Sequence, residues 1–245
     1  MKPGPNSTPD LSPLLAFGAH PDDIEFGVGG VIARETSLGR PVHMVVCSRG
    51  EAASHGTPAQ RTAEAGEAAK ILGATLEFVE IGGDAHFEVR VEHAIALAKV
   101  IRRVKPGIVL APTTVENQHP DHAVLGALVR DAARLARYGG VGELKHEASH
   151  SVGSLLYYAV GAEGEPRDIS PILVDISSGE IIDTWKRAMQ AHASQTSARE
   201  YFEMQLTRAR MHGVRAGVGH AIPLFPNDPV VIDSLGPISR TARRF

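Results

Sequence analysis

The chain has 245 residues, of which 43% are hydrophobic and 22% charged, with a formal net charge of −3. This composition fits one large globular domain, and the net charge gives no sign of the clustered basic residues that binding of nucleic acid or an anionic membrane requires, so both functions are disfavoured. No apolar run approaches the roughly 20 residues of a membrane span, and the N-terminus lacks a secretion-signal pattern. We therefore expect a cytoplasmic protein, in which the single cysteine, Cys47, is a buried thiol.

The chain divides into three parts. Residues 1–13 carry four prolines among small polar residues, which predicts a flexible lead-in. Residues 14–229 show alternating strand and helix patterns without an internal repeat or a linker, so a single domain is predicted. Residues 230–245 are expected to form a C-terminal tail, because too few apolar residues follow Pro226 for an element of its own.

The first predicted strand, 14–19, runs directly into His20, Pro21, Asp22 and Asp23. Ligands of open parallel α/β sheets bind beyond the carboxyl ends of the strands, so these side chains should face a site. His20 and Asp23 stand three residues apart on one tight turn, a spacing at which both can reach a single ion. Asp22 lies between them.

Two other interpretations of this turn have to be weighed. Gly27 and Gly29 after a strand resemble the start of a dinucleotide-binding loop, but Ile32 stands where the third glycine belongs, and the neighbouring carboxylates would repel a pyrophosphate. A helix is predicted instead over 28–38. An ordinary turn, in which Asp22 caps that helix, stays open on this evidence alone.

A strand over 42–47 completes a βαβ unit with a right-handed crossover. The loop 48–56 leaves the carboxyl end of this strand, so it should face the same site, unless it is only a solvated glycine-rich connection. Arg61 lies at the start of the next predicted helix, which runs to Leu72. There it could contact a substrate or form a surface pair with Glu64.

A strand over 75–81, a loop over 82–87 and a helix over 91–104 follow. The next apolar run, 107–112, reads as a buried strand and leads to His119, Pro120, Asp121 and His122. A second His-Pro-Asp sequence beyond a strand is hard to explain by chance. Two histidines and a carboxylate leave an open coordination position, as catalytic zinc requires, so the two clusters predict a mononuclear metal site.

The remaining elements are predicted with less regular spacing. The long segment 138–152 is interpreted as a lid or a subunit contact, because long loops within compact domains are usually functional. The other elements are a helix over 121–137, strands over 153–160 and 172–176, and helices over 178–193 and 200–214.

At its two clusters the sequence resembles a known family. The stretches Ala19-His20-Pro21-Asp22-Asp23-Ile24-Glu25 and His119-Pro120-Asp121-His122 are similar to the paired signature of the LmbE-like (PIG-L-like) zinc-dependent N-acetylglucosaminyl deacetylases. The resemblance extends from Leu14 to about Pro229. The stretch around 191–195 is most similar to deacetylases of the bacillithiol pathway, which act on N-acetylglucosaminyl-malate.

The resemblance implies a role for each residue of the site. It makes His20, Asp23 and His122 the ligands of one Zn²⁺ per chain and Asp22 the general base. His119 would stabilise the oxyanion and help the amine to leave, and Asp121 would orient a histidine. The family carries an Arg-Gly-Glu-like loop that lines the sugar pocket, which implies substrate-binding roles for Arg49 and Glu51. Arg61 and His192 are the further candidates for the substrate pocket, His192 as a pocket wall or packing residue in a stretch that resembles the family's His-x-Ser-Gln.

The expected fold is a single Rossmann-like α/β domain with a mostly parallel sheet, helices on both faces and the metal at the strand carboxyl ends. The expected reaction is the hydrolysis of an acetamide by a zinc-bound water. The partner is then a small amino-sugar conjugate, and relatives of this kind are often homo-oligomers, in some cases hexamers. A metal-dependent binding protein is the alternative from another class, although it would need no base at Asp22.

Overall fold

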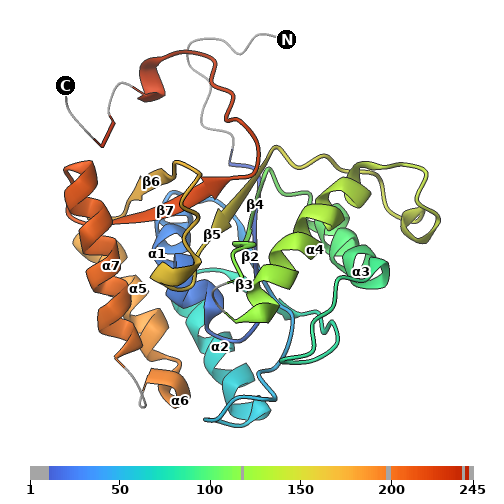
Figure 1. The fold of residues 1–245 in the computed structure, drawn as a ribbon, viewed down its shortest axis with the longest axis horizontal. Helices are drawn as coiled ribbons and strands as arrows, with labels where there is room; N and C mark the ends of the chain where they lie inside the picture. The colour runs from blue at the N-terminus through green and yellow to red at the C-terminus, as the bar shows by residue number, and fades with distance from the viewer. Residues whose placement is uncertain (1–10, 117–118, 197–199, 239–240, 243–245) are drawn as a thin grey trace.

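The computed structural model describes residues 11–116, 119–196, 200–238 and 241–242, so most of the predicted lead-in lies outside the described residues. These residues form one sheet of seven strands in the order β3-β2-β1-β4-β5-β7-β6 (Figure 1). The strands are β1 (Leu14–Gly18), β2 (Val42–Val46), β3 (Thr75–Phe78), β4 (Ile108–Pro112), β5 (Ser154–Tyr158), β6 (Ile172–Asp175) and β7 (Ala221–Pro226).

Five neighbouring strands, β3, β2, β1, β4 and β5, pair in parallel. The central strand β1 is buried along its whole length, as expected for a strand that is covered on both faces. Leu14 and Ala16 belong to the apolar core on one face of the sheet, and Leu15 and Phe17 to the core on the other. The predicted fold class is confirmed: one α/β domain with a mostly parallel sheet and helices on both faces.

The two faces carry different helices (Figure 1). One core includes residues of α1, α2, α5 and α7, and the other is built with α3 and α4. The helices are α1 (Asp23–Ser37), α2 (Pro58–Leu72), α3 (Val91–Val104), α4 (Pro120–Arg137), α5 (Gly179–Gln190), the short α6 (Ala193–Thr196) and α7 (Tyr201–Ala216). Within the described residues, no helix combines the length and hydrophobicity that a membrane crossing needs.

Helix α1 begins at Asp23, five residues before the predicted start at Val28. The glycines of its first turns allow close packing. A Cβ at Gly27 would lie 2.5 Å from Cδ2 of Tyr158, and one at Gly29 would lie 2.9 Å from Cδ1 of Trp185. These glycines therefore allow α1 to pack closely against Tyr158 and Trp185. This packing explains the glycine-rich sequence, and no nucleotide-binding role is needed.

The other edge of the sheet differs from the prediction. Strand β7, which the sequence did not predict, pairs antiparallel with both β5 and β6. The predicted strand over 75–81 ends at Phe78, and the predicted helix over 178–193 ends at Gln190. Prolines at 223 and 226 obscure the pattern of β7, because proline is confined to sheet edges and strand ends.

The segment 138–152, predicted to be a lid or a subunit contact, joins the end of α4 to the start of β5 and so lies at the edge opposite the strand carboxyl ends. Buried Arg102 of α3 holds it by donating to the carbonyls of Leu144, Glu147 and Tyr138. The prediction that this segment is a lid is therefore wrong, and a role as a subunit contact stays a prediction.

Candidate active and metal-binding site

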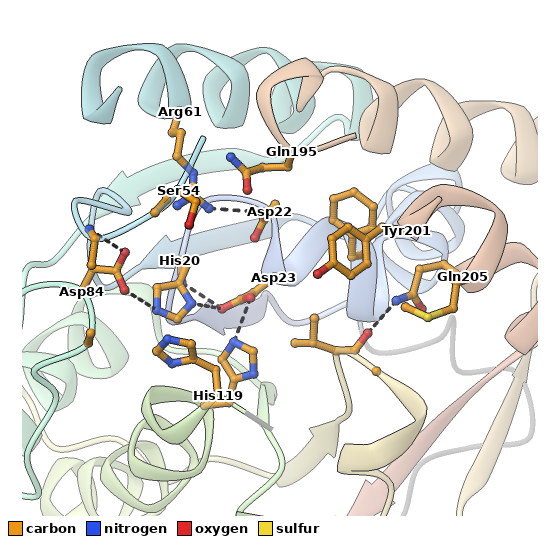
Figure 2. Close-up of a pocket in the computed structure, with 18 of the residues that line it drawn as sticks. His20, Asp22, Asp23, Ser54, Arg61, Asp84, His119, Gln195, Tyr201 and Gln205 are labelled. Carbon is orange, nitrogen blue, oxygen red and sulfur yellow. Dashed lines mark hydrogen bonds and ion pairs between the residues drawn. The ribbon is translucent and has the colours of Figure 1, made fainter. Parts of the chain in front are cut away.

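A cavity of about 560 Å³ opens at the carboxyl ends of the parallel strands (Figure 2). Loops that follow all five parallel strands contribute to it, as the position of ligand sites in open α/β sheets predicts. Its wall consists of His20, Asp22, Asp23, Phe26, Ala52, Ala53, Ser54, Arg61, Asp84, Ala85, His119, His122, Val160, Gly161, Glu163, Gln195, Tyr201, Met204 and Gln205.

Asp23, in the first turn of α1, is the centre of the buried polar cluster. Its Oδ2 accepts hydrogen bonds from the backbone nitrogens of Ala19 at 2.9 Å and His20 at 2.8 Å, and its Oδ1 lies 3.0 Å from Nε2 of His122. Burial would raise the pKa of Asp23, but the adjacent His122 and His20 rings hold that pKa well below its usual value. Asp23 is therefore an ionised carboxylate between two imidazoles.

His20 has carboxylates on both sides of its ring (Figure 2). Its Nδ1 lies 3.3 Å from Oδ2 of Asp23, whereas Nε2 lies 3.1 Å from Oδ1 of Asp84 and 3.3 Å from Oδ2 of Asp121. Burial lowers the pKa of His20, but Asp23, Asp121 and Asp84 together raise it well above its usual value. The carboxylates that contact Nε2 fix the orientation of the ring, so that Nδ1 faces Asp23.

His20, Asp23 and His122 have ligand atoms within 4.8 Å of one another, so the three residues could hold a metal ion. His122 supports this interpretation, because it is buried, its Nε2 faces Asp23, and its Nδ1 has no hydrogen-bond partner among the described residues. Buried polar atoms are rarely left without a partner. Two histidines and one carboxylate match the donor set of a catalytic zinc site with an open position.

A second group, His20, Asp84, His119 and Asp121, also meets this distance limit. Both carboxyl oxygens of Asp121 already accept from backbone nitrogens, those of Ala85 at 2.7 Å and Phe87 at 3.4 Å, whereas the backbone donors of Asp23 use Oδ2 alone and leave Oδ1 facing His122. We therefore favour the first group as the metal ligands. Asp84 and Asp121 then orient the His20 ring through their contacts with its Nε2.

Asp22 precedes α1 in a strained backbone conformation, with φ of 118°, which is rare for a residue other than glycine. Strain of this kind persists where the surrounding structure enforces it, often at functional sites. Arg61 of α2 is one such constraint, since its Nη2 donates to the carbonyl of Pro21 at 2.8 Å and to Oδ2 of Asp22 at 3.3 Å. Burial and Asp23 raise the pKa of Asp22 to about 6, although Arg61 opposes the shift.

His119 caps the N-terminus of α4 and lines the cavity with a partly exposed ring. Its Nδ1 accepts a hydrogen bond from the backbone nitrogen of Asp121 at 3.3 Å, so the neutral ring carries its proton on Nε2. Burial and the neighbouring His20 lower the pKa of His119. A neutral imidazole with a free N–H is thus presented to the cavity.

The structure brings together His20, Asp22, Asp23, His119 and His122, all of which line the cavity. Asp121 lies directly behind them. Of the four candidate substrate-binding residues, only Arg61 lines the cavity. Arg49 is turned outward, where it pairs with Glu80 at 2.6 Å, and Glu51 is exposed. The fully buried His192 lies 3.2 Å from Glu25, behind the wall.

Several cavity residues were missed by sequence reasoning. Asp84 follows two glycines after β3, and its position beyond the carboxyl end of a strand was the available signal. Residues Tyr201, Met204 and Gln205 lie on α7, and only the packing of α7 against the other helices of its face brings them to the site. No local motif could have identified them.

Comparisons with known proteins agree with this geometry. A family model described as GlcNAc-PI de-N-acetylase (PIG-L) matches residues 15–133. The diacetylchitobiose deacetylase of Thermococcus kodakarensis is 29% identical over 196 residues, which are 76% of this chain and 71% of that protein. The crystal structure of a conserved protein from Thermus thermophilus has 32% sequence identity and a TM-score of 0.79, and the match covers 93% of this chain and 99% of that one.

A relative with another activity has a similar structure. The 4-carboxy-2-hydroxymuconate hydratase of Pseudomonas putida has 26% identity and a TM-score of 0.78, and the match covers 92% of this chain and 100% of that one.

Fold and site define an α/β protein with a metal-competent cavity at the carboxyl ends of a parallel sheet. The family model and the relatives identify it further: the chain belongs to the PIG-L family of deacetylase-like proteins.

Proposed function

We propose that the chain is a zinc-dependent hydrolase that removes the acetyl group from an N-acetylglucosamine conjugate. One observation carries this proposal: Asp22, a carboxylate in a strained turn with a pKa of about 6, borders the same cavity as the metal-competent His20, Asp23 and His122. A binding protein would need the ligands but not the base. A general base is most useful when its pKa lies near the working pH.

Each residue has a place in the reaction. When bound at His20, Asp23 and His122, a zinc ion supplies Lewis-acid polarisation of the acetamide carbonyl and acidifies a water. Asp22 accepts the proton of the attacking water as the new C–O bond forms. As the C–N bond breaks, Asp22 returns that proton to the leaving nitrogen, so a free amine leaves and the acetic acid formed ionises to acetate.

His119 contributes as a neutral hydrogen-bond donor. Its Nδ1 is occupied by the backbone nitrogen of Asp121, so Nε2–H is available to the oxygen that gains negative charge in the tetrahedral intermediate. Asp84 and Asp121 keep the His20 ring in place through its Nε2. These contacts hold the site ready before substrate enters.

The second candidate is a hydratase, which the structural similarity to the Pseudomonas putida enzyme favours. The substrate in that enzyme's name carries several carboxylates, and such a substrate calls for cations in the cavity. Apart from the metal ion that the site could hold, Arg61 is the one lysine or arginine among the described residues that line it, and its Nη2 already contacts Asp22 and Pro21. The cavity therefore favours the uncharged acetamide of the first proposal.

The test is incubation of the zinc-loaded chain with N-acetylglucosamine glycosides, including N-acetylglucosaminyl-malate, with acetate and free amine measured separately. The proposal predicts equal amounts of both products, and formation of both about 10²–10⁴-fold slower with the Asp22→Asn variant. Hydration of 4-carboxy-2-hydroxymuconate without acetate release would establish the hydratase instead. The N-acetylglucosaminyl-malate substrate, a location in the cytoplasm and assembly into homo-oligomers stay predictions.

A further inference from the structure

A second hollow lies beside the catalytic cavity, along helix α7. It has a volume of about 620 Å³, and Tyr201 and Met204 line both the cavity and this groove. Met211 continues the groove two turns further along the helix. The three side chains are 37%, 40% and 50% exposed, so a row of apolar surface leads out of the cavity into solvent.

The spacing of these residues puts them on one face of the helix. Positions 201, 204 and 211 recur at helical period, whereas Gln205, Ala209 and His212 turn inward and are buried. The row therefore does not belong to the core. The volume of the groove lies within the range of about 300–1,000 Å³ that is typical of sites for small molecules.

The charges around the groove are negative. Glu200 and Glu203 line it, and Glu163 lines the adjoining cavity. Arg208 is the one arginine or lysine among the described groove residues. It is buried and donates to Glu165 at 2.6 Å and to the carbonyl of Ala159 at 2.9 Å. An anionic group in the groove would meet carboxylates, and its nearest cation is already paired.

We propose that this groove, defined by Tyr201, Met204 and Met211, is a subsite for an apolar, uncharged aglycone of the substrate. The inference rests on the proposed function, because the acetamide must sit in the cavity for its aglycone to reach the groove. The continuous wall of Tyr201 and Met204 and the acidic surroundings carry it. Among amino-sugar conjugates, an anionic one such as N-acetylglucosaminyl-malate then fits the groove least.

The test compares methyl and hexyl β-glycosides of N-acetylglucosamine, which differ only in the length of an apolar aglycone. Each methylene that becomes buried should raise kcat/KM about fourfold, the factor that corresponds to about 0.8 kcal/mol. Because the hexyl group would be only partly buried, we expect kcat/KM of the hexyl glycoside to exceed that of the methyl glycoside at least about tenfold. The malate conjugate should fall below the hexyl glycoside.

Met211→Ser tests the position of the subsite, because Met211 lines the groove but not the cavity. It should lower kcat/KM for the hexyl glycoside more than kcat/KM for the methyl glycoside, and so reduce the hexyl advantage. Val214→Ser is the matched control: Val214 is 64% exposed on the same helix and lines neither hollow, so both rates should stay as in the wild type.

The outcomes separate the two proposals. If no glycoside releases acetate, the proposed function fails and the subsite fails with it. If the methyl glycoside reacts but the hexyl glycoside gains nothing, or the malate conjugate is preferred, the subsite alone is wrong. If Met211→Ser leaves the hexyl advantage intact and instead changes the molar mass in light scattering, the groove is a contact between copies of the chain.

Discussion

Nη2 of Arg61 lies 3.3 Å from Oδ2 of Asp22, and both groups are largely withdrawn from solvent, with side chains 5% and 18% exposed. The contact joins the first turn of α2 to the turn before α1. Burial and the adjacent Asp23 raise the pKa of Asp22, and the positive charge of Arg61 opposes this rise. Arg61 thus helps to keep Asp22 ionised, in the form that can accept a proton.

This contact makes a prediction about pH. Asp22 acts when deprotonated, so kcat/KM should fall as the pH drops through the pKa of Asp22, at or below about 6 because a bound cation lowers it further. Removing the Arg61 charge by Arg61→Met raises that pKa and should shift the acid limb to higher pH. Arg61→Lys keeps the charge and should shift it less. An unchanged acid limb in Arg61→Met would show that the limb belongs to another group.

Asp84 should matter for metal affinity. It lies 3.1 Å from Nε2 of His20, and the change Asp84→Asn removes its negative charge at nearly constant size. Loss of a carboxylate that orients a ligand histidine typically weakens metal binding about 10–100-fold. Competition with a chelator measures this directly. Asp183→Asn, at an exposed position of α5, is the control and should bind zinc as the wild type does.

His119 should separate metal binding from rate. Since its Nδ1 accepts from the backbone and its ring faces the cavity, His119→Ala should retain zinc while kcat falls about 10²–10³-fold, the usual effect of removing one oxyanion donor. Elemental analysis and steady-state kinetics on the same preparation test both halves. A variant without zinc would place His119 among the ligands.

Arg102 should be important for stability but not for catalysis. It is 2% exposed and donates to several backbone carbonyls of the chain after α4, including Tyr138 at 2.7 Å and Glu147 at 2.9 Å. Arg102→Met leaves those carbonyls without a donor and should lower the free energy of unfolding by about 2–4 kcal/mol.

Arg103→Met, at the neighbouring exposed position, should change the free energy of unfolding by no more than about 0.5 kcal/mol. Urea unfolding compares the two. Equal losses in both variants would mean that the buried contacts of Arg102 contribute nothing beyond those of a surface arginine.

The sequence predicted much of the fold for identifiable reasons. The apolar run of β1 and the helical period of α3 are local patterns, and each is strong enough to define its element. Strand β7 was missed because its prolines weaken the strand pattern and its antiparallel pairing depends on partners far away in the chain. The early start of α1 was missed because Asp23, predicted to lie in the turn, forms the first turn of the helix.

The site residues likewise differ in whether a local motif or only a distant contact identifies them. His20, Asp23 and His122 could be found from two short motifs, because strand ends bring such motifs to one edge of the sheet. Asp84 has no motif around it and is recognised only by its distance from His20. Arg49 lies in the loop that was expected to face the site, but its guanidinium lies 4.8 Å from the ring centre of Phe78 and pairs with Glu80, so its side chain points away from the site.

The adjacent Asp22 and Asp23 have different roles in this mechanism, Asp22 as the general base and Asp23 as a metal ligand. Asp23 faces both histidines, whereas Asp22 faces Arg61 and lies outside the metal-competent group. The amide of Asn cannot accept a proton from water, so Asp22→Asn should keep zinc while its rate of acetate release falls about 10²–10⁴-fold. Asp23→Asn replaces an anionic ligand by a neutral one, so its main defect should be metal affinity, with partial recovery in excess zinc.

The most direct measurement is therefore the zinc content of these two variants, determined beside their rates of acetate release at saturating and at limiting zinc. We predict full zinc with a low rate for Asp22→Asn, and low zinc with a rate that rises on zinc addition for Asp23→Asn. The opposite pattern, in which Asp22→Asn loses zinc and Asp23→Asn retains it, would contradict the assigned roles.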